Sequence, residues 1–438
     1  MRDIALVVVF GGLLFMCFRR SYIAPLLWAW ISMMSPHRLT FGFAYSLPFG
    51  QVAAGMTFLG LFITKQRFRF PTSAPAVLLV VFFAWNCLTA AVSFNTPEVV
   101  WAMWSKVAKI QIMLFLSLLL IGGKQQINLL VGVVTLSVAF YGAKGGLFTL
   151  LRGGGGTVWG PPGSFIEGNN ELGVAFVMVI PLLYYLAGQM KNIWHRRALF
   201  AAMFFTFVST LGTHSRGALL AVVTMAFFLG VKSKRTVVTL LTLAVVLGGM
   251  AAFMPDNWTD RMSSISSHQD HSAQSRLYTW QMILNMSASN PISGGGYNVT
   301  ENPATWHRYA VTEWAKAYSP HSIYFQALAE HGYVGLFLYL AIGFLTWRLA
   351  SRVAKAARDG PDADWVPPLM RMIQVSLMGF AVGGAFVNLV NYDLPYYLVA
   401  IVALVARDVG DGRAPLPVAV PARPAARKPR PPTVRPSP

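Results

Sequence analysis

The residues best suited to chemistry in this sequence are arginines, lysines and a histidine in polar connections between long apolar runs. Arg216 occurs in the short connection 213–217, and Arg152 directly precedes four glycines. His321 lies at the end of the one long polar segment, residues 255–321. Arginine presents paired N–H donors that match phosphate oxygens, and a neutral histidine can accept a proton. These residues therefore indicate a binding site for a polyanion with a general base beside it.

A second interpretation is that basic side chains near a membrane extend towards lipid phosphate groups. This interpretation is the better explanation for a single lysine. Lys106 and Lys109 are one helical turn apart and share a face, so the two together could also contact one ligand. The lipid interpretation is the poorer explanation for Arg216, which stands between a serine and a glycine in a short turn. Other basic residues in such connections are Arg38, Lys144, Arg261, Arg276, Arg308 and Lys316. Arg216 is accordingly favoured as a functional residue.

The sequence around His321 predicts how this side chain is placed. Ser319 and Pro320 precede it, a pair typical of a helix start with serine as N-cap and proline in the first position. His321 then falls in the first helical turn, where backbone N–H groups and the macrodipole disfavour its protonated form. A neutral histidine near pH 7 suits a general base. A histidine that merely caps the entry of the next span is equally compatible with these residues.

The elements that position these residues are helices in a membrane. Hydrophobic residues make up 55% of the 438 positions and charged residues only 12%, which excludes a soluble domain of this length. Apolar runs of spanning length recur without alternating ten-residue strands, so we expect an all-α polytopic membrane protein. The runs are 4–18, 22–35, 43–64, 74–94, 104–121, 127–150, 171–190, 198–213, 217–231, 236–254, 332–349, 370–391 and 395–406. Thirteen spans would place the N-terminus outside; we expect about twelve, with one short run not spanning independently.

The distribution of positive charge predicts the orientation of the chain. The net charge of +19 does not indicate nucleic-acid binding, because much of the excess lies in short clusters between apolar runs: 19–20, 65–69, 191–197, 232–235 and 348–358. These clusters are expected on the cytoplasmic side of a bacterial inner membrane, which places 213–217 and 255–321 on the periplasmic face. The chain then divides into membrane helices 1–254, a partly helical periplasmic segment 255–331, membrane helices 332–406 and a disordered basic tail 407–438.

Three other motifs carry less weight. Asp362 and Asp364 form a D-x-D in an inner loop with no nucleotide-binding domain around it. The histidines and aspartate of 267–271 lack further ligands for a metal. The glycines 153–156 lack the strand and the Gly-Lys-Ser/Thr of a nucleotide-binding loop. We therefore expect no metal ion and no cofactor.

The order of motifs resembles a known family. An Arg-Gly at a hairpin tip (216–217) precedes a long segment with Asp-Arg-Met (260–262), Ser-Arg (275–276) and Asn-Pro-Ile-Ser-Gly-Gly-Gly (290–296), which closes with Pro-His-Ser (320–322) and Glu-His-Gly (330–332). Together these are similar to the bacterial O-antigen ligases. Ser-Pro-His-Arg-Leu (35–39), Lys-Gly-Gly (144–146) and Gly-Asn-Asn (168–170) resemble the exosortase-associated branch of that family. The resemblance covers the chain except its tail.

The resemblance implies an activity. Family members transfer a glycan from undecaprenyl pyrophosphate to a periplasmic acceptor, which in lipopolysaccharide ligases is a lipid A–core sugar. Arg216 and His321 match the essential arginine and histidine of the family. We expect His321 to act as the base and Arg216, with Arg152, Arg261 and Arg276, to bind pyrophosphate. Further substrate contacts are expected from Lys106, Lys109 and Asn170.

Other functions stay open at this point. A polymerase of lipid-linked repeats, or a ligase that transfers the glycan to a protein hydroxyl, would use the same donor and the same topology. A polysaccharide or lipid transporter is a more distant alternative. It would require ionisable residues at mid-membrane depth, where most of these runs carry none. Direct displacement by an acceptor hydroxyl predicts inversion at the anomeric carbon, without a metal ion.

Overall fold

The computed structural model describes residues 1–63, 68–231, 248–249, 255, 271–311 and 317–410. Every regular element in these ranges is a helix, and they contain no strand, which confirms the predicted all-α class. The apolar run 236–254, most of which falls between the described ranges, and Arg261 cannot be placed on this architecture. The same is true of the predicted tail beyond residue 410.

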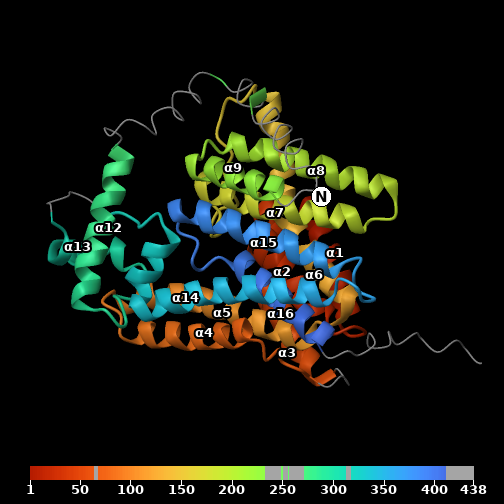
Figure 1. Cartoon of the computed structure of the whole chain (residues 1–438), viewed down its shortest axis with the longest axis horizontal. Helices are drawn as coiled ribbons and strands as arrows, with labels where there is room; N and C mark the ends of the chain where they lie inside the picture. The colour runs from red at the N-terminus through yellow and green to blue at the C-terminus, as the bar shows by residue number, and fades with distance from the viewer. Residues whose placement is uncertain (64–67, 232–247, 250–254, 256–270, 312–316, 411–438) are drawn as a thin grey trace, which may run out of the picture.

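The first half of the chain forms α1 (Arg2–Cys17), α2 (Ile23–Met34), η1 (Pro36–Leu39), η2 (Phe43–Ser46), α3 (Phe49–Ile63), α4 (Ala74–Ala91), α5 (Pro97–Leu120), α6 (Gly123–Leu151), α7 (Asn169–Gln189), α8 (Ile193–Gly212) and α9 (Arg216–Val231). The second half forms α12 (His271–Ser289), η4 (Val299–Glu301), α13 (Pro303–Tyr309), α14 (Ile323–Ala356), α15 (Val366–Gly383), η5 (Gly384–Phe386) and α16 (Asp393–Gly410). Figure 1 shows that the long helices run roughly alongside one another, with α12 and α13 gathered at one end of the bundle.

The described helices include six that are long and apolar enough to cross a membrane: α4, α5, α6, α7, α14 and the continuous stretch of α15 and η5. Three shorter apolar helices lie within α2, α3 and α9. This composition confirms a multi-pass membrane protein. The expected number of about twelve spans is not established by these nine helices and stays a prediction.

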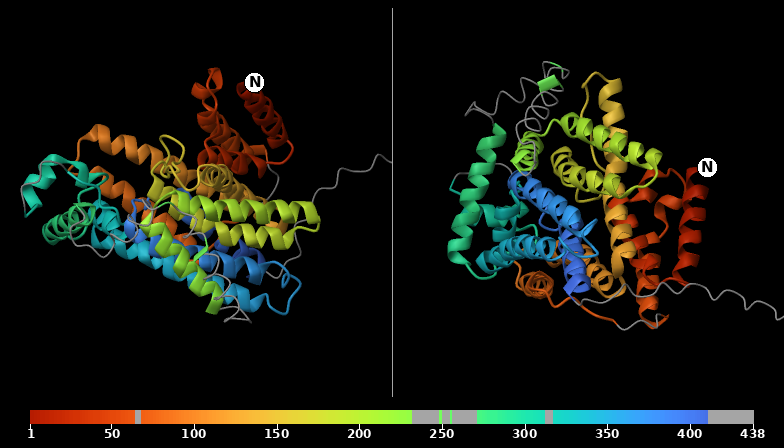
Figure 2. Two further views of the ribbon diagram at one scale, coloured as in Figure 1. Left: turned by 90° about the horizontal axis from the view of Figure 1, so that it is seen from above. Right: turned by 45° about the vertical axis from the view of Figure 1, so that its right-hand side comes forward.

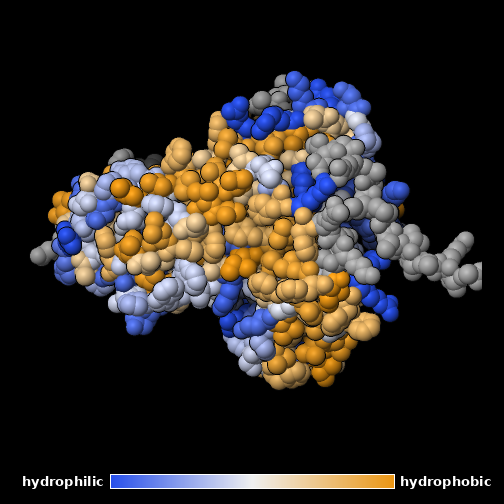
Figure 3. Space-filling view, turned by 90° about the horizontal axis from the view of Figure 1, so that it is seen from below, coloured by the Kyte–Doolittle hydropathy of each residue, from blue (hydrophilic) through white to orange (hydrophobic). Residues whose placement is uncertain are grey.

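The bundle has two distinct ends. At one end, which we call the site end, the connection between α6 and α7 meets the end of α8 through the amide of Val158 and the carbonyl of Gly212, 2.9 Å apart. At the opposite end, Lys124 pairs with Asp364 at 2.6 Å, and Gln189 donates to the carbonyl of Asp364. In Figure 3, hydrophobic residues predominate over the middle of the visible face, and more polar residues gather where α12 and α13 project. This is the surface expected of a membrane-embedded bundle.

Helix α7 is the centre of the bundle. Its residues from Leu172 to Leu183 are buried without interruption, so the helix has no polar face. A helix that is apolar all round must be surrounded by protein or lipid. Here protein surrounds it, because α6, α8, α9 and α15 all pack against α7. This central position fixes the place of the polar residues at the N-terminal end of α7.

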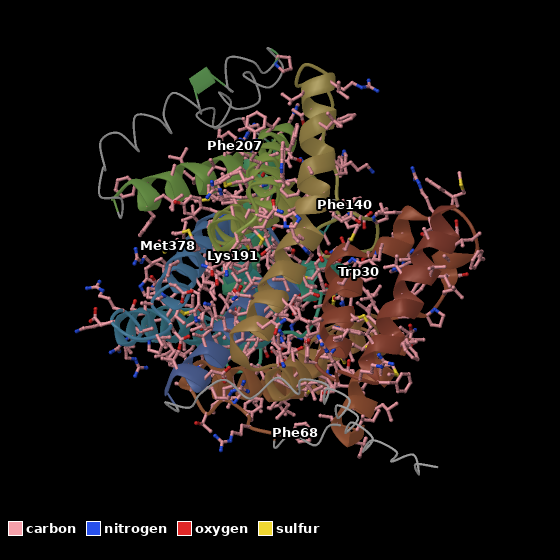
Figure 4. The ribbon with its side chains drawn as sticks, turned by 90° about the vertical axis from the view of Figure 1, so that its right-hand side faces the viewer. Trp30, Phe68, Phe140, Lys191, Phe207 and Met378 are labelled. Atoms are coloured by element: carbon pink, nitrogen blue, oxygen red, sulfur yellow. The ribbon has the colours of Figure 1, made fainter. Side chains whose placement is uncertain are left out.

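Small residues bring α6 and α8 into close contact. The glycines Gly142, Gly145 and Gly146 leave no room for a Cβ, because Thr206, Ser209 and the carbonyl of Phe205 occupy that space. Close approach through small residues is the usual way in which membrane helices pack. The Lys-Gly-Gly motif is thereby explained at its two glycines. In Figure 4, α6 with Phe140 lies beside the helix α2 that carries Trp30.

Helices α1, α2 and α3 form a subgroup with an apolar core of its own, to which the inner part of α5 contributes. Figure 2 shows α1 standing out from the rest of the bundle. Arg2, at the start of α1, lines a cavity together with Lys144 near the end of α6. The first helix therefore begins at the site end.

Helix α14 is interrupted by a kink at Gly332, which has a φ of 68°. The motif 290–296 fits into this kink: the amides of Gly295 and Gly296 donate to the carbonyls of Ala329 and Glu330 at 2.8 and 3.0 Å. A Cβ at Gly332 would collide with the carbonyl of Ile292. Only glycine combines this positive φ with such close backbone contact. The Gly-Gly-Gly and Glu-His-Gly motifs are therefore two halves of one structural joint.

Candidate functional site

Arg216 is the first residue of α9, at the tip of the hairpin that α8 and α9 form. Ser215 is buried, and its hydroxyl accepts a hydrogen bond from the amide of Ala218 at 3.2 Å, which caps the start of α9. The carbonyl of Thr213 accepts from Nδ2 of Asn169 at 2.8 Å. This bond ties the hairpin tip to the first turn of α7. Arg216 is thus presented, partly buried, from a turn held at two points.

His214 adds a third contact to the hairpin tip. Its Nε2 lies 3.2 Å from the carbonyl oxygen of Gly154, in the glycine run that follows α6. The backbone of His214 has a φ of 53°, in the left-handed region that non-glycine residues seldom occupy. Such strained positions persist only where surrounding contacts hold them. The glycines 153–156 therefore act as a partner of the Arg216 turn.

His321 has the same local arrangement. Its φ is 46°, Ser322 follows in extended conformation as N-cap, and α14 begins at Ile323. The predicted helix start at Ser319 and Pro320 was wrong, because the left-handed residue ends any helix before Ser322. His321 is not in a first helical turn. It lies in the approach to the helix, partly buried.

The residues expected to start the helix serve other purposes. The hydroxyl of Ser319 donates to the carboxylate of Glu301 at 2.6 Å. Pro320 is buried, and its carbonyl accepts from Nε1 of Trp280 at 2.8 Å. The backbone on the N-terminal side of His321 is thus fixed by α12, and Ile323 on the other side is buried. The backbone is thus fixed on both sides of His321.

The imidazole of His321 is neutral at physiological pH. Burial, together with the nearby guanidinium of Arg276, lowers the pKa of His321 from 6.5 to about 4. The prediction of a neutral histidine is confirmed, but its cause is burial and a neighbouring cation in place of the helix macrodipole. Nδ1 is buried and makes no hydrogen bond within the described part of the chain. A neutral ring with a free nitrogen lone pair can accept a proton.

Arg276 reaches this site from α12. Trp280, one turn further along the same face, stacks on Phe325 of α14 with ring centroids 4.6 Å apart and planes 7° from parallel. The stack and the bond from Trp280 to Pro320 press this face of α12 against the start of α14. Arg276 is thereby placed close enough to His321 to lower its pKa. The sequence predicted Arg276 as a site residue, and the structure brings the two together.

Glu171 also belongs to this group, and the sequence analysis did not predict it. Glu171 lies in the first turn of α7, two residues beyond Asn169, and is partly buried. Its carboxylate accepts a hydrogen bond from the backbone N–H of Asn388 and interacts with the charge of Arg276. Nothing in the sequence pairs residue 171 with residue 276. The sequence feature that could have indicated Glu171 is its position next to the Gly-Asn-Asn motif, at the N-terminal end of a helix.

The turn η5 joins the Arg216 and His321 parts of the site. A Cβ at Gly217 would lie 2.9 Å from Cβ of Phe386, and a Cβ at Gly384 would lie 2.5 Å from Ile323. The start of α9 and the start of α14 therefore pack on the same three-residue turn. With Asn169 and Glu171 from α7, the group comprises Arg216, Arg276, His321, Glu171 and the buried Asn169. We call these five residues the convergent site.

The remaining predicted residues lie elsewhere or at the edge. Arg152 is exposed and stacks over Phe148 at 5.6 Å, although its glycine loop contacts the Arg216 turn. Lys106 donates to the carbonyl of Gly163 at 3.1 Å, and Lys109 is exposed. Asn170 is partly buried, and its neighbour Asn169 makes the bond to the hairpin. Arg261 lies outside the described residues.

Comparison with known families supplies the context for this geometry. Residues 200–340 match the family model described as O-antigen ligase. The match supports assignment to the O-antigen ligase family. It includes Arg216, Arg276 and His321, three of the five residues of the convergent site. Residues 1–191 match a family of unknown function, and no curated protein is significantly similar to the chain. The match supports an O-antigen ligase or polymerase type of function in general.

Proposed function

We propose that this protein is a membrane glycosyltransferase that moves a glycan from undecaprenyl pyrophosphate to a sugar hydroxyl of lipid A–core on the periplasmic face of the bacterial inner membrane. The observation that carries the proposal is the grouping of a neutral histidine just before α14, an arginine at the start of α9 and an arginine within α12. Their assignment to one enzyme site is supported by the O-antigen ligase match over residues 200–340. The acceptor and the donor rest on the family resemblance.

His321 has the properties of the general base in this reaction. A sugar hydroxyl has a high pKa, so proton removal as it attacks lowers the barrier. Because His321 is neutral, its ring is available for that proton over the whole range near pH 7. The acceptor oxygen forms a bond to the anomeric carbon while the bond from that carbon to pyrophosphate oxygen breaks. The proton goes to His321, and the configuration at the anomeric carbon inverts.

Arg216 and Arg276 suit the other half of the reaction. The departing undecaprenyl pyrophosphate gains negative charge, which preorganised guanidinium groups stabilise best in a partly dehydrated site. Arg216 is held in place by the capped start of α9, and Arg276 by the Trp280 stack. The carboxylate of Glu171 interacts with the charge of that guanidinium. The protein thereby supplies both a base and a leaving-group site from its own side chains.

Reconstituted transfer tests the proposal. The full-length protein in proteoliposomes would be given undecaprenyl-pyrophosphate glycan and lipid A–core, with EDTA present. Transfer is expected with wild type, and a loss of at least about a hundredfold with His321→Ala or Arg216→Gln. His307→Ala and Arg308→Gln are matched controls, because both residues are exposed on α13 and lie outside the convergent site. Full transfer by a folded His321→Ala protein would overturn the assignment of the base.

The acceptor is tested separately. A growing lipid-linked glycan and a peptide with serine or threonine hydroxyls would replace lipid A–core in the same assay. Longer products on undecaprenyl pyrophosphate would identify a polymerase, and a glycopeptide would identify a protein ligase. Donor binding without transfer to any of the three acceptors would contradict a transferase function.

A further inference from the structure

A cavity at the site end, separate from the convergent site, has a lining suited to an anion. It has a volume of about 400 Å³, within the range of about 300–1,000 Å³ typical of small-ligand sites. Three cationic residues line it, Arg2 from α1, Arg38 from η1 and Lys144 from α6, and no aspartate or glutamate is among its lining residues. Three positive charges around one cavity repel one another unless an anion lies between them. The convergent site contributes none of its five residues to this lining.

The acidic residue nearest in sequence is bonded outside the lining of this cavity. Asp3 follows Arg2, but its carboxylate accepts hydrogen bonds from the amides of Gly42 and Ala44 at 3.1 and 3.0 Å. These bonds hold the loop before η2 against the start of α1. Arg38 is held in turn by a bond to the hydroxyl of Tyr45 at 2.6 Å and lies over its ring. The cations are thus positioned by the fold around the cavity.

Aromatic side chains complete the lining. Tyr141, Phe148 and Trp159 border the cavity, and the Trp159 side chain is 63% exposed. Trp159 therefore presents a broad aromatic face at the cavity that a ligand can cover. Aromatic faces pack well on the C–H faces of sugar rings, whereas the headgroups of phosphatidylglycerol and phosphatidylcholine offer no such face. The combination of cations and aromatic rings therefore favours a phosphorylated sugar.

The position of the cavity links it to the convergent site. Residues 157–162 of the α6–α7 connection line it. The same connection bonds to the end of α8 through Val158 and contacts His214 through Gly154. It ends at Asn169, which holds the Arg216 turn. The α6–α7 connection therefore borders both the cavity and the convergent site.

We propose that this cavity is an anion subsite that binds a phosphate group carried by a saccharide. The phosphate part of this inference rests on the three cations of the lining. The identification of the saccharide as part of the acceptor rests on the proposed function. With a transferase at the convergent site, a phosphate on the inner sugars of the acceptor is the group that would occupy it. The subsite would then hold the acceptor while its hydroxyl reaches His321.

Direct binding tests the subsite independently of transfer. The full-length protein in dodecyl maltoside would be titrated with N-acetylglucosamine 1-phosphate and with unphosphorylated N-acetylglucosamine. Saturable binding of the phosphorylated sugar alone is expected. Lys144→Gln should weaken it by at least about tenfold, the size of one charged hydrogen bond. Lys355→Gln, on an exposed lysine at the opposite end, should leave it unchanged.

A second pair of variants makes the test robust. Arg38→Gln should also weaken binding, and Arg20→Gln is its control, because Arg20 likewise bonds to a tyrosine hydroxyl but does not line the cavity. Arg216→Gln should abolish transfer and keep the binding. Loss of binding in Arg216→Gln would place the sugar phosphate in the convergent site and overturn the subsite. Equal affinity for both sugars would overturn it as well.

A lipid headgroup is the other source of the same phosphate chemistry. Native mass spectrometry of wild type and Lys144→Gln with phosphatidylglycerol or phosphatidylcholine separates the two sources. Phosphatidylglycerol that binds through Lys144, with no binding of the sugar phosphate, would identify a lipid site and contradict the saccharide assignment. Intact transfer in Lys144→Gln with a dephosphorylated acceptor would show that the proposed function stands without the subsite.

Discussion

Replacing Arg276 by glutamine tests whether the charge on α12 keeps His321 neutral. Burial and Arg276 together lower the pKa of His321 from 6.5 to about 4. The difference favours the neutral ring by about 3 kcal/mol, at roughly 1.36 kcal/mol for each unit of pKa. At pH 5.5 about 97% of the rings are then neutral, against about 9% for a histidine with an ordinary pKa.

The pH dependence of transfer is the measurement. If His321 is the base, kcat/KM in wild type should be level from about pH 8 to pH 5.5 and fall only near pH 4. In Arg276→Gln the neighbouring cation is gone while burial remains. The pKa of His321 should rise towards 6.5 without reaching it, and the acid limb should move upward with it. Arg276 is also assigned to pyrophosphate binding, so its loss should lower the maximal rate for a second reason. The test therefore depends on the pH at which kcat/KM falls on the acid side, and the maximal rate is not used.

Arg308→Gln is the control, since this arginine is exposed on α13. Its pH profile should coincide with that of wild type, which excludes a general effect of lost positive charge. The reasoning is refuted if Arg276→Gln keeps the acid limb of wild type. It is refuted equally if folded His321→Ala shows the same acid limb, because another group would then be titrating.

Three further predictions concern stability and the hairpin tip. Asn169→Ala removes the bond to the hairpin tip and should cost about 1–3 kcal/mol in thermal unfolding and reduce kcat, whereas His307→Ala, at an exposed position on α13, should change neither appreciably. Gly146→Ala places a methyl group against the backbone of α8 and should destabilise the protein by about 1–3 kcal/mol or more, while Gly132→Ala on the same helix, with open space around it, should not. The unfolded chain protonates His321 below pH 6.5, whereas the folded chain does so only near pH 4. The free energy of unfolding should therefore fall by up to about 3 kcal/mol as the pH drops through this window. When melting temperatures at pH 7 and pH 4.5 are compared, His321→Ala should lose less stability than wild type.

The sequence predicted which residues belong to the candidate site better than it predicted the backbone that places them. Arg216, Arg276 and His321 were all identified from residue type and order, and the structure brings Arg276 to His321. The start of α14 was predicted three residues too early, because the Ser-Pro pair matches a local helix signal. Nothing local to that pair reveals that His321 adopts a left-handed φ. That conformation depends on contacts from α12 and η5, which are distant in sequence.

Residue composition and order alone indicate the class of the protein: continuous apolar runs predicted the helices, and charged clusters predicted which connections share an end. These signals are local, so they can be read without the fold. The contacts between these residues could be identified only from the tertiary structure. Glu171 became a site residue because α7 is central, and the glycine motifs proved to be points of close backbone contact. Contacts between residues a hundred positions apart depend on how the helices pack, and no single stretch of sequence encodes that packing.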